Sequence, residues 1–151
     1  MTFRSALTTL ASLSVPGVIH NYDVDTAPDD LSRVQLPTLL TLPIPPDETR
    51  LHREAGQGFQ ATAFSAGPRT ATYTVTHLLL VAPAAAGRGQ RSLLPGLIDL
   101  IDAYFSALAA NVTLSSTLLE PAHVRVEPGQ FTYGHAAYYG CAFRHTWLIQ
   151  I

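Results

Sequence analysis

Lysine is absent from this 151-residue chain, and all nine of its basic residues are arginines. Charged residues make up only 13% of the chain, about half the usual share, and the formal net charge is −2. The arginines are scattered, so the chain lacks the basic patch that nucleic-acid-binding proteins carry. Small soluble domains rely on surface charge to stay apart. We therefore expect a partner to cover part of this weakly charged surface.

Two explanations of the missing lysine stay open. One is the coding bias of a GC-rich genome, which replaces lysine codons throughout a proteome. The other is that arginine suits interfaces, because its planar guanidinium makes bidentate pairs and stacks on aromatic rings.

Cysteine and long hydrophobic runs are also scarce. A single cysteine excludes an intrachain disulfide, and Cys141 lies in an alternating apolar segment, which predicts a small core residue. The longest apolar stretch, 75–86, is interrupted by His77 and Pro83 and is too short to cross a bilayer. The N-terminal segment is a poor signal peptide. No membrane association is expected.

Hydrophobic periodicity predicts one α+β domain over residues 1–151. Helices are predicted at 3–14 and 91–110, and a short extended piece at 18–22. The predicted strands are, in chain order, 33–43, 58–64, 70–81, 123–127 and 138–150. The order α-β-β-β-α-β-β favours a mostly antiparallel sheet of about four to five strands with two helices packed on one face. Prolines at 43, 45 and 46 predict a projecting loop at about 43–57.

Three local predictions can be checked against a structure. Pro37 cannot donate to a ladder, so the 33–43 strand is expected at an edge or bulged there. Pro128-Gly129 is expected to form a type II turn between the last two strands. The second helix is expected to bury one stripe on its surface, formed by Leu94, Leu97, Ile98, Ile101, Phe105 and Leu108.

The core is expected to combine residues of the second helix with residues of the two long strands. Its predicted members are Leu97, Ile101, Phe105, Val75, Leu79, Phe143 and Trp147. The last strand carries apolar residues on both faces, which predicts a central strand with one face against the helices and the other against something more polar.

Catalytic and metal-binding patterns are missing. The six histidines have no compact ligand spacing, so neither a metal nor a cofactor is predicted. The chain has no Gly-x-Ser-x-Gly elbow, and Gly87-Arg88-Gly89 lacks the Lys-Ser/Thr of a phosphate loop. We therefore expect no enzyme. One alternative stays open, a small ligand-binding or enzymatic domain in which His77 and His145 meet across adjacent strands, with Tyr133 or Tyr139 beside them.

Several short segments together resemble one family. They are the helix followed by Pro16-Gly17-Val18-Ile19, the segment from Leu36-Pro37 to Pro43, the hairpin ending in Leu78-Leu79-Leu80-Val81-Ala82-Pro83, and Tyr138-Tyr139-Gly140 near the end. In this order they resemble the tail-terminator and tail-completion proteins of siphophages and myophages, the lambda-type minor tail proteins of the head–tail joint. The similarity covers most of the chain.

The resemblance implies a virion structural protein, assembled in the host cytoplasm, that forms a homo-oligomeric ring, expected to be a hexamer. The ring would cap the tail tube and join it to the neck, with the tube protein and a head-completion protein as partners and DNA only as passing cargo. Another neck or baseplate component on the same scaffold is an alternative.

A closed ring needs two different complementary patches on each subunit. We expect them on the 43–59 arm and on the 84–91 loop. The candidate interface residues are Arg50, Leu51, Arg53, Phe59, Arg88 and Arg91. The alternative for each arginine is an ordinary solvated loop residue.

Overall fold

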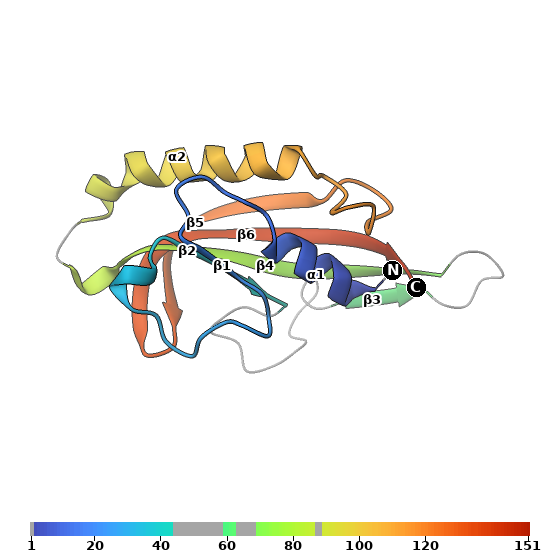
Figure 1. The fold of residues 1–151 in the computed structure, drawn as a ribbon, viewed down its shortest axis with the longest axis horizontal. Helices are drawn as coiled ribbons and strands as arrows, with labels where there is room; N and C mark the ends of the chain where they lie inside the picture. Colours follow the sequence, from blue (N-terminus) through green and yellow to red (C-terminus); the bar gives the residue numbers. More distant parts are fainter. Residues whose placement is uncertain (1, 44–58, 63–68, 87–88) are drawn as a thin grey trace.

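The computed structural model describes residues 2–43, 59–62, 69–86 and 89–151. In this part of the chain, one sheet carries two helices on one face (Figure 1). The helices are α1 (Phe3–Ala11) and α2 (Gln90–Ala109). Two short 3-10 turns, η1 (Arg33–Gln35) and η2 (Ala84–Ala86), lie between them in the sequence. The strands are β1 (His20–Tyr22), β2 (Thr38–Leu42), β3 (Phe59–Thr62), β4 (Thr70–Pro83), β5 (His123–Tyr133) and β6 (Ala136–Gln150).

The strand order is β1-β2-β4-β6-β5. β3 pairs with the first residues of β4, and β2 pairs with later residues of the same strand. The β1–β2 pair is parallel, and the other pairs are antiparallel. The predicted α+β class and the mostly antiparallel sheet are thus confirmed. The extended piece predicted at 18–22 contains β1. The predicted 33–43 strand is divided into η1 and β2, and β2 is not an edge strand. Pro37 instead stands just before β2, where its missing N–H removes no ladder bond.

The centre of the sheet is the long antiparallel pair of β4 and β6. Their register runs from Thr70 opposite Gln150 to Pro83 opposite Tyr138, with one irregularity between Leu80 and Ala82. Gly140 makes this close pairing possible, because a Cβ at that position would lie 1.8 Å from the carbonyl oxygen of Leu79. β6 lies between β4 and β5, so its predicted central position is confirmed.

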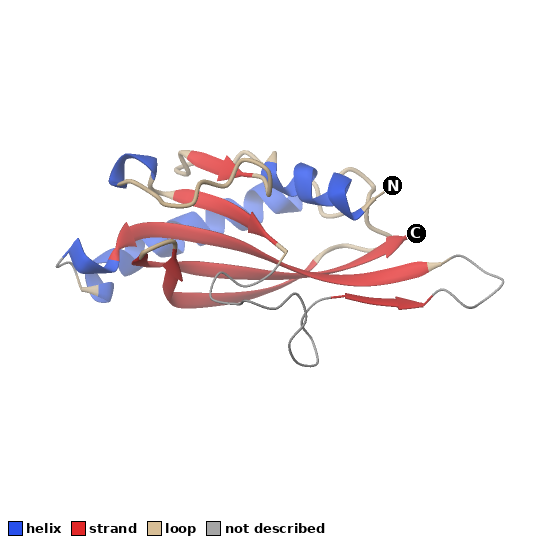
Figure 2. Cartoon of the chain, turned by 90° about the horizontal axis from the view of Figure 1, so that it is seen from below, coloured by secondary structure: helices blue, strands red, loops and turns tan. Residues whose placement is uncertain are grey.

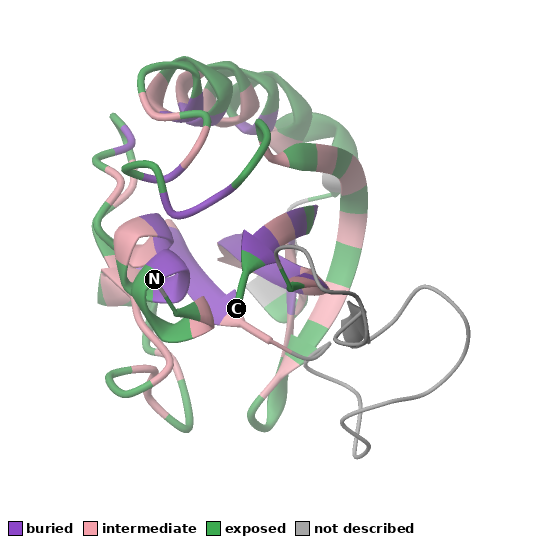
Figure 3. Ribbon diagram, turned by 90° about the vertical axis from the view of Figure 1, so that its right-hand side faces the viewer, coloured by how far each residue is buried: buried purple, intermediate pink, exposed green. Residues whose placement is uncertain are grey.

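Each face of the sheet has its own apolar cluster. Figure 3 marks the buried residues of the chain in purple. The cluster between the helices and the sheet contains Leu10, Leu39, Leu79, Phe143 and Trp147, together with eleven further buried residues. The opposite face holds a smaller cluster of Leu36, Leu40, Leu78, Leu80, Tyr138 and Ala142. The segment 23–36 covers this second cluster, since the Tyr138 and Tyr133 hydroxyls donate to the carbonyls of Leu31 and Pro28. In Figure 2 the view is from below, and α2 lies behind the strands.

The predicted turn at Pro128-Gly129 is wrong. Both residues lie inside β5, opposite Cys141 and Gly140 of β6. β5 is an edge strand, where a proline is tolerated because one side of the strand has no ladder to complete. The turn is instead Gly134-His135, and the positive φ of Gly134, 60°, is the conformation that glycine supplies most readily.

The buried face of α2 also differs from the predicted stripe. Leu97 and Leu108 are buried as expected, but Phe105 is 37% exposed, Leu94 48% and Ile98 49%. Tyr104, which was not among the predicted core residues, is 1% exposed and lies beneath the helix. Phe105 is therefore displaced from the core by its neighbour. Hydrogen bonds explain which side of the helix turns inward, because the Tyr104 hydroxyl contacts two buried histidines of the sheet.

Candidate functional site

A network of hydrogen-bonded polar side chains, three of them buried and one half-buried, crosses the core from α1 to β6. It consists of Asn21 on β1, His77 on β4, Tyr104 on α2 and His145 on β6, and we call it the polar network. Asn21 Oδ1 lies 2.8 Å from His77 Nε2. The Tyr104 hydroxyl lies 2.9 Å from His77 Nδ1 and 2.6 Å from His145 Nε2. One tyrosine of α2 thus holds the two histidines of the sheet together.

The contacts at the two ends of the network fix the direction of every hydrogen bond. The indole N–H of Trp147 can only donate, and its target is His145 Nδ1 at 3.2 Å, so the proton of neutral His145 is on Nε2. At the other end, Asn21 Nδ2 donates to the carbonyls of Leu10 and Leu13, at 3.2 and 3.1 Å.

The amide oxygen of Asn21 consequently accepts from His77 Nε2–H. His77 Nδ1 then accepts from the Tyr104 hydroxyl, whose oxygen accepts from His145 Nε2–H. Every polar atom of the network is satisfied with both imidazoles neutral.

Burial keeps this network neutral. Burial, and then the nearby His145, hold the pKa of His77 well below its usual value. Burial alone lowers the pKa of His145 to about 3. Burial, followed by the influence of Cys141, raises the pKa of Tyr104 well above its usual value. A general acid or base needs a pKa near the working pH and access to a substrate. These groups have neither, so the arrangement fastens α1 and α2 to the sheet.

His77 and His145 do meet across adjacent strands, with ring centroids 6.4 Å apart. The tyrosine between them is Tyr104, however, and neither Tyr133 nor Tyr139. Tyr133 lies on the opposite face of the sheet, where its hydroxyl donates to Pro28. The two histidines are 0% and 1% exposed and line neither of the hollows described below.

Tyr104 is a central residue of the polar network that the sequence analysis did not predict. A signal for it exists in the spacing of the helix. Leu97, Ile101, Tyr104 and Leu108 follow one another at intervals of four, three and four residues, which places them on one helix face. The predicted stripe was chosen from apolar residues alone and therefore does not include Tyr104.

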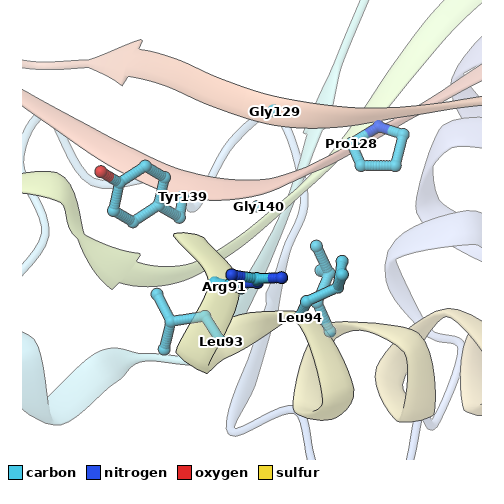
Figure 4. A pocket seen from close by; sticks show the side chains of 8 residues that line it. Arg91, Leu93, Leu94, Pro128, Gly129, Tyr139 and Gly140 are labelled. Atoms are coloured by element: carbon cyan, nitrogen blue, oxygen red, sulfur yellow. The ribbon is translucent and has the colours of Figure 1, made fainter. Parts of the chain in front are cut away.

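The first turns of α2 stand over a hollow of about 390 Å³ against β5 and β6, which we call the α2 hollow (Figure 4). Its walls are mostly apolar. They are formed by Leu93, Leu94 and Leu97 on the helix side and by Pro128, Gly129, Tyr139 and Gly140 on the sheet side. Arg91 is the one charged residue of this lining. It is exposed and forms no ion pair with any residue that the structure describes.

Arg91 is thus the predicted interface residue that the structure places at a hollow. Phe59 begins β3, and its backbone pairs with Tyr73. The other predicted interface residues, Arg50, Leu51, Arg53 and Arg88, lie outside the described residues, as does the predicted loop at about 43–57 except for Pro43. The neighbouring hollow itself was not predicted, because its two walls come from segments about forty residues apart in the sequence.

The opposite face of the sheet carries a charged cluster. Glu127 accepts hydrogen bonds from Arg144 Nε and Arg125 Nη2, both at 2.5 Å. Arg144 Nη1 also donates to the hydroxyl of Thr76 at 3.1 Å. Burial alone would raise the pKa of Glu127, but the hydrogen bonds and charges of Arg144 and Arg125 bring it below its usual value. A smaller hollow of about 240 Å³ lies beside Arg144, and its guanidinium is already committed to Glu127 and Thr76.

Metal-binding and nucleophilic chemistry find little support among the described residues. No group of three histidine, cysteine, aspartate or glutamate side chains within that part could hold a metal ion. Cys141 is buried, and burial raises the pKa of its thiol to about 12, which leaves almost no thiolate at neutral pH.

The segment Arg91–Ala109 of α2 is long and apolar enough to cross a membrane, a test that core helices of soluble proteins also pass. Only 17% of this helix is buried. Its exposed Asp99 and Asp102 would be costly in a bilayer interior. The notable property of α2 is therefore how much apolar surface it leaves uncovered.

No protein-family model matches the chain, and a comparison with curated proteins finds no match either.

Proposed function

We propose that this chain is a structural subunit of a phage or phage-like tail that assembles into a ring, caps the tail tube and joins it to the neck. The observation that carries the proposal is the uncovered apolar surface of α2. A helix that is firmly attached to a sheet and yet exposes Leu94, Ile98 and Phe105 is expected to meet another protein surface.

The low charge of the chain supports the same proposal. Charged residues make up 13% of the sequence, so little charge is present to keep this surface soluble and separate. The order of elements, α1 then a sheet with α2 inserted before β5 and β6, is the one predicted from the hydrophobic periodicity of the sequence. The function is therefore one of surfaces rather than of an active site.

The test is assembly. The purified chain should form a closed ring, visible by negative-stain electron microscopy and by light scattering, or should enter one when the tail tube protein of the same genome is added. A chain that stays monomeric up to millimolar concentration, and that binds neither tube nor neck proteins, would contradict the proposal.

The catalytic alternative makes a different prediction. If His77 and His145 bound a ligand, a compound protecting the folded chain should lose its effect in variants of either residue. The buried and fully hydrogen-bonded state of both imidazoles gives no support to this alternative. Another neck or baseplate role on the same scaffold would be distinguished by which tail protein the chain binds.

A further inference from the structure

We infer that the α2 hollow of one copy receives Val34 from a second copy of this chain, in a head-to-tail contact. This inference rests on the proposed function, since it names the surfaces through which ring subunits would meet. It is carried by two complementary surfaces on opposite sides of one sheet.

The receiving surface is the α2 hollow. Its walls are leucines, a proline, glycines and a tyrosine, and it is large enough for an aliphatic side chain. Leu94 lines it while remaining 48% exposed, so apolar surface continues from the hollow onto the outside of the helix. An apolar side chain that enters removes this surface from water. Arg91 at the same hollow, free of any described ion pair, favours a partner with carboxylates.

The inserting surface is the segment 23–36, which we call the acidic loop. It contains four aspartates and one arginine. Val34 projects from it and is 81% exposed, the largest value among the large apolar residues of the described chain that stand exposed. Asp29 and Asp30 are exposed on the same loop, a few residues before Val34 in the sequence, and after burial their charges are the main cause of the raised pKa of Tyr133. The loop thus presents an apolar side chain together with negative charge.

The two surfaces lie at the same end of the sheet but on opposite faces. Tyr138 and Tyr139 are successive residues of β6 and point to opposite faces. Tyr138 donates to Leu31 of the acidic loop, whereas Tyr139 lines the α2 hollow. In Figure 1, α2 lies above the sheet.

A contact between two different patches uses only one patch of each copy. Each copy in a pair therefore keeps one patch free for a further copy. Such a heterologous contact closes into a ring or continues as a filament, whereas a contact of like with like stops at two copies. The charges agree with this direction, because Arg91 faces the aspartates of the neighbour and like patches would repel.

Disulfide trapping tests the contact directly. Cys141 is buried, and the pKa of its thiol is raised, so an introduced cysteine is the reactive one. One population carries Val34→Cys, the other carries Leu94→Cys, and the two are mixed under mild oxidation. We expect a cross-linked pair in the mixture and little product from either variant alone. A chain with both substitutions should give a ladder of covalent oligomers.

Val112→Cys is the matched control for Leu94→Cys. Val112 is an aliphatic residue with 42% exposure, it lies outside the α2 hollow, and it should not cross-link to Val34→Cys. Equal product with the control, no product in the mixture, or a dominant Leu94→Cys dimer would each overturn the inference. The last result would indicate a symmetric contact between two α2 helices.

Charge reversal gives a second reading. Arg91→Glu and Asp29→Arg should each weaken self-association by about tenfold or more, because each places like charges together. An equimolar mixture should recover assembly, since both kinds of contact in an alternating arrangement then pair opposite charges. Asp99→Arg, exposed on α2 but off the ridge of Leu94, Ile98 and Phe105, should assemble like the parent. If the parent forms rings and the mixture does not recover, this inference fails and the proposed function stands. If the parent neither assembles nor binds tail proteins, the proposed function fails.

Discussion

The two halves of α2 have the same kind of sequence and opposite environments. In the second half, Tyr104 and Leu108 are 1% and 5% exposed, and the hydroxyl of Tyr104 joins two histidines of the sheet. In the first half, Leu94 and Ile98 are about half exposed, and the α2 hollow lies between the helix and the strands. The second half is attached to the core through Tyr104 and Leu108, whereas the first half contributes Leu97 to the core and presents Leu94 and Ile98 to the outside.

The difference shows that apolar composition alone does not decide what a helix buries. Both halves carry leucines at helical spacing. Only the second half also has a polar partner that fits beneath it, and the need to satisfy His77 and His145 selects the face that turns inward. The first half leaves Leu94 and Ile98 largely uncovered.

Matched leucine truncations should separate the two halves most strongly. Leu108→Ala removes a buried side chain and should lower the free energy of unfolding by about 2–5 kcal/mol. Leu94→Ala makes the same chemical change at a half-exposed site and should cost well under half as much. Urea unfolding followed by circular dichroism measures both. Equal losses would mean that the first half of α2 is attached as firmly as the second.

The pH dependence of stability tests the neutral state of the polar network. The unfolded chain binds protons on His77 and His145 near pH 6.5, whereas the folded chain does not until far lower pH. Stability is therefore complete above about pH 6.5 and falls as the pH is lowered toward 3. Between pH 7.5 and 5.5 the expected loss is about 1 kcal/mol for each histidine.

Urea unfolding at several pH values measures this loss. A stability curve that is flat from pH 7.5 to 5.5 would show that the two buried imidazoles are not held neutral.

Tyr104→Phe removes one oxygen atom and keeps the ring. It leaves His77 Nδ1 without a donor and His145 Nε2–H without an acceptor, which should cost about 1–3 kcal/mol. Tyr139→Phe is the matched change at the α2 hollow and should cost less than about 0.5 kcal/mol. If the two variants melt at the same temperature, the network contributes nothing to the attachment of the helix.

Ile98→Ser should have the smallest effect on stability and a clear effect on association. Its side chain is 49% exposed, so the free energy of unfolding should change by less than about 1 kcal/mol. Sedimentation velocity at increasing concentration should show weaker self-association than in the parent. Unchanged association would remove Ile98 from the contact surface.

Much of the fold was predictable, because strand alternation and helical periodicity are strong in this chain. The long strands β4 and β6, the extent of α2 and the position of β6 inside the sheet all follow from local patterns. The turn at Pro128-Gly129 was predicted wrongly, since this pair also fits an edge strand. The Pro-Gly pair by itself does not distinguish a turn from an edge strand, and the pairing with β6 decides between them.

The sites were less predictable for the same physical reason. Phe105 was expected inside and Tyr104 was overlooked, because the pattern treats a tyrosine as polar until its partners are known. Those partners, His77 and His145, are 27 and 41 residues away. The α2 hollow likewise depends on segments that meet only in the folded chain.

The parallel pairing of β1 and β2 has a mechanical consequence. Parallel neighbours need a crossing connection, and here the acidic loop makes it, directly after Tyr22. A pull on that loop reaches Asn21, and from there it passes sideways through His77 to Tyr104 and α2. Tension between neighbouring copies would thus cross the subunit through side chains rather than along the backbone. Asn21→Ala should interrupt this path and make local opening of α2 more frequent. Faster amide hydrogen exchange in α2 would measure this change.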